Sequence, residues 1–447
     1  MRPRVVITGI GTVCGLGLGA EALWAGMTAG RSCLGPITRF DASGFASRLA
    51  GEVRDFSARD FVPKHYRKAV KVMARDVELA VAAAKLAVED AGLVTRAALA
   101  DEAGGAPAAA ATYPAARMGC QIGAGLIAAE IDELTLAFAS ARSAGAPDRL
   151  DLRAWGATGM DNLTPLWLLK YLPNMLACHV TIIHGAEGPS NTITCSEASA
   201  LLSIAESVRV IRRGAADLCF SGGAESKVNP MGLIRQDLAG RLAPTRGDLE
   251  PAAHVRALAD EASGTVLGEG GGILVLEEAC AARTRGARVY AEVAGIGAGQ
   301  SHPWYAGAGD GDDPDEGYGQ AVRAALDDAG VRPDQVGAIV PLASGVPEID
   351  AAEVSTLRAV FGARLPTIPV ITHCANLGNT MAGAGGIQAA LGALALSRQA
   401  IPARLGPAAA GLDTGPAAAR PAVLDSVLVC TGALGGQNAA VVLRRPG

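Results

Sequence analysis

One stretch constrains the fold of this chain more than any other. Residues 188–200 read Gly-Pro-Ser-Asn-Thr-Ile-Thr-Cys-Ser-Glu-Ala-Ser-Ala, in which a β-branched run ends in a cluster of small residues. From Leu201 to Arg213, apolar residues recur at the spacing of a buried helix. The pattern predicts a strand, a sharp turn and a helix, with one side chain held at the helix N-terminus, where unpaired N–H groups stabilise negative charge. That position suits a nucleophile, but here it carries Glu197.

Length and composition limit the classes of protein to which this chain can belong. The chain has 447 residues, of which 50% are hydrophobic and 19% are charged, so it exceeds the size at which a single core stops growing. We therefore expect two domains or one duplicated unit. The 57 glycines and the low aromatic content of 4% indicate close backbone packing in a layered α/β protein. A net charge of −5 argues against a nucleic-acid binder.

The cysteines and the hydropathy pattern predict a cytoplasmic protein without a metal site. The nine cysteines are scattered, with no C-x-x-C pair and no short Cys/His cluster, as is typical of reduced, buried thiols. The first residues run directly into a strand and lack the apolar segment of a signal peptide. A charge-free run from Leu377 to Ser397 contains several glycines and polar residues, so we interpret it as a packed interior segment and not as a membrane span.

The elbow and several later motifs resemble those of the β-ketoacyl synthases, which have the thiolase-like fold. In that family, Gly-Pro-Ser or Gly-Pro-Asn precedes the acyl-accepting Cys by a fixed spacing, and the same spacing here ends at Glu197. Further matches are the Gly-Gly-Ala-Glu turn at 222–225 and the Gly-Gly-Gln-Asn loop at 435–438. The resemblance extends from Val5 to Arg444.

This resemblance implies an α/β fold in which a βαβαβαββ unit is duplicated and stacked in five layers, αβαβα. A strand, helix, strand pattern resumes at Val289, as expected of a second copy. We place the division near residue 255, with an N-terminal ketosynthase-like half at 1–255 and a C-terminal ketosynthase-like half at 256–447.

The catalytic positions of the family can be checked one by one. A ketosynthase needs a thiolate to hold the growing chain and two imidazoles to promote decarboxylation and polarise the thioester carbonyl. In the family, the first His stands eight residues before an Asp, and here Leu342 stands eight residues before Asp350. The second His follows a Gly, and here Asn379 follows Gly378. By the resemblance, Glu197, Leu342 and Asn379 occupy the three catalytic positions, and none is intact.

This altered set resembles the chain length factor, or ketosynthase β subunit, of type II polyketide synthases, where the elbow residue is Gln. The resemblance implies a catalytically inactive subunit that forms a heterodimer with an active ketosynthase α subunit and sets chain length by shaping the polyketide tunnel. It implies no bound cofactor, because the phosphopantetheine arm of an acyl carrier protein delivers the chain. Candidate substrate-binding residues are Phe138, Trp167 and Leu434, of which Leu434 stands in place of the family's gating Phe.

Two rival functions stay open at this point. One is a malonyl carrier decarboxylase that makes an acetyl primer, for which Asn379 is the remaining side-chain donor at the aligned positions. The other is an active condensing enzyme that uses Cys195, which requires the elbow to shift by two residues. His373 is a weaker candidate for a displaced base, because it lies six residues before Asn379 on the incoming strand.

The basic segment that begins at Lys64 has two interpretations. It is either a solvated face of a long amphipathic helix or a docking patch for the acidic helices of a carrier protein. The sequence leaves the product, an aromatic polyketide or a reduced polyene, undecided.

Overall fold

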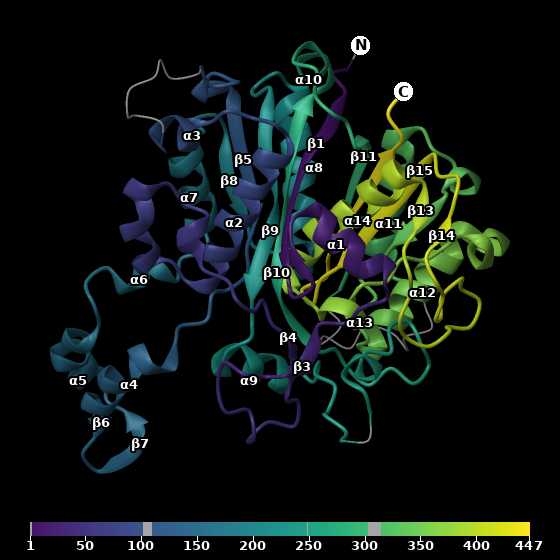
Figure 1. Cartoon of the computed structure of the whole chain (residues 1–447). Helices are drawn as coiled ribbons and strands as arrows, with labels where there is room; N and C mark the ends of the chain where they lie inside the picture. Colours follow the sequence, from purple (N-terminus) through teal and green to yellow (C-terminus); the bar gives the residue numbers. More distant parts are fainter. Residues whose placement is uncertain (1, 102–109, 248, 303–313) are drawn as a thin grey trace.

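A computed structural model describes residues 2–101, 110–247, 249–302 and 314–447. A mixed sheet, largely buried except at its edge strand β8, runs through the middle of the molecule (Figure 1). Along its main path the strands follow the order β12, β15, β16, β11, β1, β10, β9, β5, β8. Their bounds are β1 Val5–Cys14, β5 Met118–Gly123, β8 Ser190–Ile193, β9 Leu218–Ser226, β10 Leu267–Glu278, β11 Ala291–Gln300, β12 Ala338–Val340, β15 Ser426–Gly432 and β16 Gln437–Arg444.

The strand pairing repeats along the chain. In the first half β5 and β9 pair in parallel, and β9, β10 and β1 then pair antiparallel. In the second half β12 and β15 pair in parallel, and β15, β16 and β11 pair antiparallel. The halves meet where Val6 of β1 pairs with Glu292 of β11. The register of β1 shifts between Ile7 and Gly9, and that of β11 shifts between Val293 and Gly295, so the two copies share even their irregularities.

Helices cover both faces of each half and fill the space between the halves. Helix α2 (Arg75–Asp90) packs on β1 and β10, and α11 (Glu316–Ala329) packs on β11 and β16. Helices α8 (Ser199–Arg212) and α14 (Ala384–Arg398) lie in the centre and contact strands of both halves. This helix, sheet, helix, sheet, helix order confirms the predicted α/β architecture.

Glycines permit the close approach of helix and strand in both halves. A Cβ added to Gly11 would lie 1.9 Å from the carbonyl oxygen of Ala83 on α2. A Cβ added to Gly297 would lie 2.0 Å from the carbonyl oxygen of Ala321 on α11. The high glycine content therefore reflects backbone-to-backbone packing, as the composition predicts.

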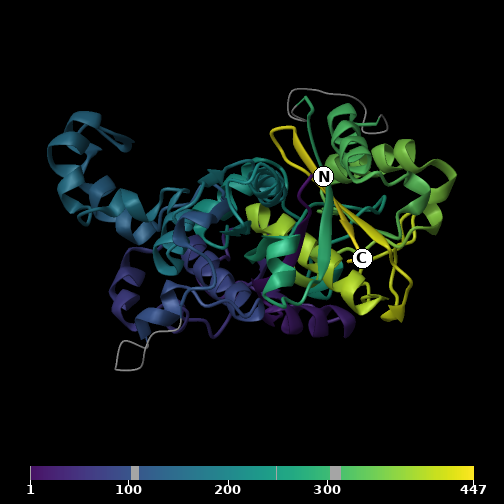
Figure 2. The ribbon, with the colours of Figure 1, turned by 90° about the horizontal axis from the view of Figure 1, so that it is seen from above.

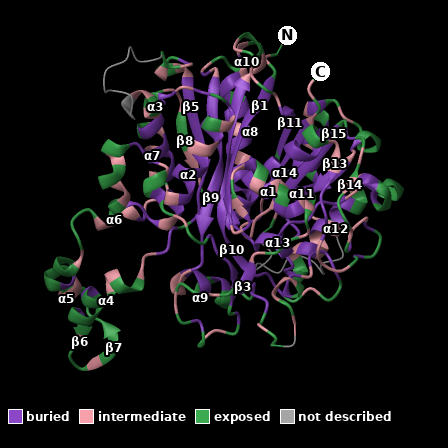
Figure 3. Cartoon of the chain, in the orientation of Figure 1, coloured by how far each residue is buried: buried purple, intermediate pink, exposed green. Residues whose placement is uncertain are grey.

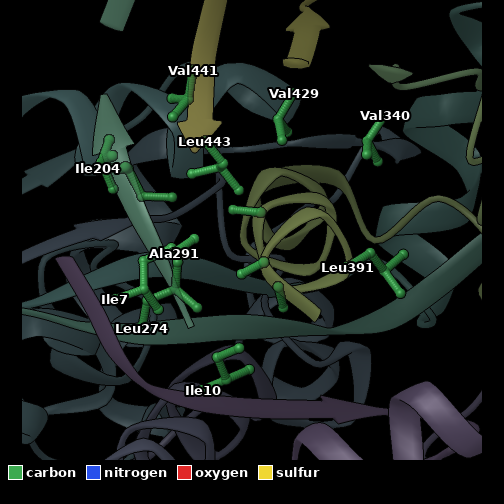
Figure 4. Packing of buried hydrophobic residues seen from close by; sticks show 14 of the residues in the cluster. Ile7, Ile10, Ile204, Leu274, Ala291, Val340, Leu391, Val429, Val441 and Leu443 are labelled. Atoms are coloured by element: carbon green, nitrogen blue, oxygen red, sulfur yellow. The ribbon is translucent and has the colours of Figure 1, made fainter. Parts of the chain in front are cut away.

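The main core forms around α14, where both halves contribute side chains. Figure 4 shows Leu391 of α14 among residues from β1, β10, β12, β15 and β16, with Ile204 of α8 beside them. These side chains are fully buried aliphatic groups. Because side chains from both halves are buried in this one core, the core joins the two halves into one body.

The predicted strand, turn and helix at residues 188–213 are present. Strand β8 ends at Ile193, Ser196 takes a positive φ of 48°, and a 3-10 turn at Ser196–Ala198 leads into α8. The second half repeats this elbow, because Met381 takes a positive φ of 52° and a 3-10 turn at Met381–Gly383 leads into α14.

One segment leaves the body. Residues 126–166, which we call the arm, project to one side in Figures 1 and 2. Figure 3 shows the arm as largely exposed, whereas the central strands are buried. Its elements are α4 Ile131–Ser140, β6 Arg142–Ser143, β7 Ala146–Leu150, α5 Leu152–Ala154, a π-helical turn at Trp155–Gly159 and a 3-10 turn at Met160–Asn162. Helix α6 (Trp167–Lys170) returns the chain to the body.

The basic segment differs from the prediction of one long helix. Residues Lys64–Val72 form a 3-10 helix, and α2 begins only at Arg75. The break arises because Met73 and Ala74 adopt extended backbone conformations.

The remaining elements complete the layers. They are β2 Gly17–Leu18, α1 Ala20–Thr28, β3 Leu34–Pro36, β4 Leu49–Gly51, α3 Arg96–Asp101, α7 Met175–His184, α9 Pro230–Leu238, α10 Ala279–Thr284, α12 Pro347–Phe361, α13 Cys374–Leu377, β13 Ala400–Ile401 and β14 Arg420–Pro421, with short 3-10 turns at Ala58–Asp60, Ala115–Arg117, Pro251–His254, Pro333–Gln335 and Gly362–Thr367. Among the described residues, no helix is long and apolar enough to cross a bilayer, and no cluster of side chains is suited to holding a metal ion.

Candidate functional site

Glu197 lies at the elbow, one residue after the positive-φ Ser196, and its side chain is 0% exposed. Its Oε1 atom forms an ion pair with Nη2 of Arg241 and accepts a hydrogen bond of 3.1 Å from Nδ2 of Asn379. Its Oε2 atom accepts a hydrogen bond of 2.7 Å from the Ser196 hydroxyl. Burial alone would raise the pKa of Glu197, but the Arg241 charge and the Ser196 hydroxyl hold it below the ordinary value. The elbow therefore carries a buried carboxylate that stays ionised.

Arg241 is the partner that sequence reasoning missed. It lies in the loop after α9, is 1% exposed, and donates through Nη1 to the side-chain oxygen of Gln236 at 3.1 Å. Its carbonyl oxygen accepts a hydrogen bond from the Thr265 amide, so the backbone also fixes its place. A single arginine in a loop has no periodicity, and it lies 44 residues from Glu197 along the chain. Only the tertiary fold brings the two together.

Asn379 is held in a single orientation. Its Oδ1 atom accepts a hydrogen bond of 2.8 Å from the Met381 amide, and its own amide donates to the Val266 carbonyl at 2.8 Å. The Nδ2 group is then directed to Glu197. One of the two N–H groups that could polarise a carbonyl is thus engaged with the carboxylate.

Leu342 follows β12 and is buried, with no polar group on its side chain. Its amide donates to Glu353 at 3.1 Å, and its carbonyl oxygen lies 3.4 Å from Sγ of Cys374. Burial, followed by the charges of Asp350, Glu353 and Glu197, raises the pKa of the Cys374 thiol well above its usual range. The structure thus brings Glu197 and Asn379 into direct contact, whereas Leu342 contacts Cys374 and Glu353 instead.

Two acidic residues on α12 hold the loop after β12 in place. Glu353 accepts hydrogen bonds from the amides of Leu342 and Ala343, and Asp350 accepts them from the amides of Ser344 and Gly345. Burial and the neighbouring Asp350 raise the pKa of Glu353 to about 7, and burial raises that of Asp350 to about 6. The loop is therefore kept in shape although the histidine expected from the family is absent.

No activated thiol stands at the elbow. Cys195 is half-buried on the strand side of the turn, where burial raises its pKa, and its amide donates to the Ser199 hydroxyl. His373 is fully buried, with a pKa lowered to about 4 by burial, and its Nε2 atom lies 3.8 Å from Sγ of Cys374. That neighbouring thiol is itself held protonated, so this cysteine and histidine do not form a reactive pair.

The three predicted substrate-binding residues lie in different places. Phe138 is an exposed residue of α4 on the arm, where its ring packs 5.1 Å from that of Trp155. Trp167 begins α6, and its ring packs 5.2 Å from that of Tyr171. Leu434 is half-buried in the turn between β15 and β16, in the other half of the molecule. Within the isolated chain they do not form one wall, and their role in binding substrate stays a prediction.

Two family models together match most of the chain. The model described as "Beta-ketoacyl synthase, N-terminal domain" matches residues 2–282, and "Beta-ketoacyl synthase, C-terminal domain" matches residues 290–407. The chain belongs to the β-ketoacyl synthase family. A curated relative, 3-oxoacyl-[acyl-carrier-protein] synthase 2 of Synechocystis, is 29% identical over 99% of this chain and 98% of its own length. The division near residue 255 stays a prediction.

Solved structures agree with this family assignment. The ishigamide ketosynthase/chain length factor is 28% identical, with a TM-score of 0.79 and full coverage of both chains. A type II polyketide synthase ketosynthase, in complex with its acyl carrier protein and bound to the hexaketide, has a TM-score of 0.80 at 22% identity, again with full coverage of both chains. These likenesses establish the thiolase-like fold of ketosynthases.

Proposed function

We propose that this chain is a catalytically inactive, ketosynthase-like subunit of a type II polyketide synthase, of the chain length factor kind. It pairs with an active ketosynthase and shapes the tunnel that sets polyketide chain length. The observation that carries this proposal is the buried Glu197–Arg241 ion pair at the elbow, where a condensing enzyme needs a thiolate.

The chemistry of the cluster supports an inactive site. Glu197 is ionised and accepts hydrogen bonds or charge contacts from Ser196, Arg241 and Asn379. A carboxylate so engaged is a poor nucleophile toward a thioester, and Leu342 can neither donate nor accept a proton. The Asn379 amide, which the decarboxylase alternative needs as a donor to the substrate, is fully buried in this chain and commits one of its two N–H groups to Glu197.

Exposed apolar side chains support the need for a partner. Of the sixteen large hydrophobic side chains that are exposed among the described residues, eleven lie between residues 126 and 182. These are Leu126, Ile131, Leu136, Phe138, Leu150, Leu152, Met160, Leu166, Leu168, Leu169 and Ile182. So many exposed apolar side chains along one segment are typical of a region that a partner protein covers.

Strand β8 borders the same region and ends the main path of the sheet. It pairs with β5 on one side, and Ser190 and Asn191 are exposed. An edge strand is open to pairing with a second chain. The partner we propose is an active ketosynthase, because this chain shares its fold with the ishigamide ketosynthase/chain length factor and lacks the catalytic residues itself.

The basic segment supports a carrier protein as the third component. Arg67, Lys68 and Lys71 are exposed on one 3-10 helix, and none of the three forms an ion pair with a described residue. An acidic helix of a carrier protein complements such a row of charge. The phosphopantetheine arm of the carrier would then supply the chain to the partner's thiolate. A cytoplasmic location also stays part of the proposal.

Co-expression with an active ketosynthase tests the proposal. We expect a one-to-one heterodimer by native mass spectrometry, no acylation of the isolated chain by acyl carrier thioesters, and no release of carbon dioxide from malonyl carrier. Carbon dioxide release by the isolated chain would favour the decarboxylase, and acylation of Cys195 would favour the condensing enzyme. A chain that forms only homodimers in the presence of the ketosynthase would overturn the pairing.

A further inference from the structure

The arm, which stands apart from the body in Figures 1 and 2, is a small folded unit of its own. Ala137 on its helix α4 is fully buried, and Nδ2 of Asn162 donates a hydrogen bond of 3.0 Å to the hydroxyl of Ser140. Within the described part of the chain, the hydrogen bonds of residues 134–163 all end on residues 131–163. The fold of this unit therefore uses no hydrogen bond from the body.

A first tether joins the beginning of the arm to a buried charge pair of the body. The Lys227 ammonium pairs with the Glu225 carboxylate and donates a hydrogen bond of 2.6 Å to the carbonyl oxygen of Leu126, the first residue of the arm. A Cβ added to Gly125 would lie 1.7 Å from Oε1 of Glu225, so the backbone crosses directly over this carboxylate. Glu225 also accepts a hydrogen bond of 2.7 Å from the Ala382 amide. The point where the arm leaves the body is therefore bound to the elbow of the second half.

A second tether joins the outgoing and the returning strands of chain at the base of the arm. Glu133, near the start of α4, forms an ion pair with Lys170 and accepts a hydrogen bond of 2.6 Å from the Tyr171 hydroxyl. The oxygen of that hydroxyl accepts a hydrogen bond of 3.3 Å from the Glu130 amide. The ring of Tyr171 is buried in the core of the first half. The two ends of the arm are thus held to each other and to the body.

We propose that the arm is a rigid unit on a hinge, and that the two tethers at its base set the direction in which it leaves the body. Glu225, Lys227 and Tyr171 are then positioning residues for the partner surface, a role that rests on the proposed function. A unit that is already directed loses less conformational freedom when a partner binds to it. Loosening either tether therefore weakens assembly, while the arm and the body each keep their fold.

One substitution in each tether tests the hinge. Gly125→Ala pushes the backbone away from Glu225, because the added methyl group has no room there. Tyr171→Phe removes the hydroxyl of the second tether and keeps the buried ring, so the chain should still fold if Gly125→Ala does not. Gly145→Ala is the matched control, because a Cβ added at this position in the arm meets nothing within 4 Å.

Electron–electron distance measurements on the full chain report the direction of the arm. One spin label is placed on the exposed Cys280 of α10 and the other on Ala144→Cys in the exposed turn of the arm, with alanine in place of the half-buried Cys33, Cys178 and Cys195. We expect a broader distance distribution in both tether variants than in the wild type and the control, with unchanged hydrogen exchange inside the arm. Unchanged widths in both tether variants would overturn the hinge, and faster exchange throughout the arm would overturn its rigidity.

The affinity for an active ketosynthase tests the positioning role. We expect Tyr171→Phe to raise the Kd of the heterodimer by about two- to tenfold, the effect of one net hydrogen bond, and Gly145→Ala to leave it unchanged. A broader distance distribution with an unchanged Kd would overturn the positioning role, although the pairing would stand. If the wild-type chain forms no heterodimer, the proposed function falls, whereas the distance distributions of the isolated chain still decide whether the tethers direct the arm.

Discussion

The two halves of the molecule share one backbone plan but place different residues at their elbows. In the first half the elbow presents the side chain of Glu197 to Arg241. In the second half the equivalent residue is Ala382, whose amide donates to Glu225 at 2.7 Å, and Glu225 forms an ion pair with Lys227. Both helix N-termini thus lie against a buried, paired carboxylate. The elbow of the first half, the place for a nucleophile, therefore has the same structural character as that of the second.

The halves also differ in the segment that leads to each elbow. Between β5 and β8 the chain forms the arm, which leaves the body and exposes apolar side chains. Between β12 and the short bridge at Val370 it forms α12, which packs on α11. The duplicated fold therefore carries its candidate partner surface in the first half.

The largest expected effect comes from breaking the ion pair at the first elbow. Arg241→Met leaves Glu197 buried without its cation, and we expect the free energy of unfolding to fall by about 3–5 kcal/mol. Replacing both residues, as in Glu197→Met with Arg241→Met, should recover most of this loss, because no buried charge remains. Chemical denaturation of the wild type and of these two variants measures the effect.

Glu197→Gln is the matched control for that comparison, since it keeps the shape of the side chain and removes the charge. An Arg241→Met variant as stable as the wild type would mean that water already reaches Glu197. In that case the first elbow would no longer resemble the second, where the carboxylate is buried and paired.

The carboxylates of the two halves should also respond to pH in opposite directions. The folded pKa of Glu353 is raised from 4.5 to about 7, so its contribution to stability is full below pH 4.5 and is lost as the pH rises through about 7. The folded pKa of Glu197 is lowered from 4.5, so its contribution is full above pH 4.5 and is lost as the pH falls through the folded value. The free energy of unfolding relative to Glu353→Gln should therefore fall by up to about 3 kcal/mol between pH 4.5 and 7.

The free energy of unfolding of the wild type relative to Glu197→Gln should stay flat between pH 4.5 and 7. It should decline only in more acidic buffer. Denaturation curves across the pH range, recorded for the wild type and both Gln variants, provide the two slopes. If both slopes have the same sign, the two carboxylates do not differ in the way the structure indicates.

Charge placed on the arm should affect assembly and not folding. Leu136 is 66% exposed and Leu152 is 75% exposed, so Leu136→Asp or Leu152→Asp costs the isolated chain little. In the heterodimer each would bury a charge, and we expect the affinity for the ketosynthase to fall at least about tenfold. Val423, which is 86% exposed in the second half, gives the control Val423→Asp, with no expected change. If all three variants lost affinity for the ketosynthase equally, the partner surface would not be confined to the first half.

The sequence was sufficient to predict the local features and insufficient for the distant contacts. The strand, turn and helix around Glu197 follow from the order of β-branched, small and periodic apolar residues, and the duplicated layers follow from the family resemblance. Arg241 could not be predicted, because a buried ion pair between a loop and an elbow is fixed by tertiary packing. For the same reason, the break at Met73 and the separation of Phe138, Trp167 and Leu434 became visible only in three dimensions.

The smallest effect concerns the thiol beside the first elbow. Cys195 is half-buried and burial raises its pKa, whereas Cys280 is exposed on α10. With iodoacetamide near neutral pH, Cys280 should therefore react first and Cys195 several-fold more slowly, as peptide mass spectrometry would show. Cys280→Ser removes the fast site and should leave the slow phase unchanged. A fast phase that persists at Cys195 would reveal an activated thiolate, and the first elbow would then differ from the second in chemistry as well as in sequence.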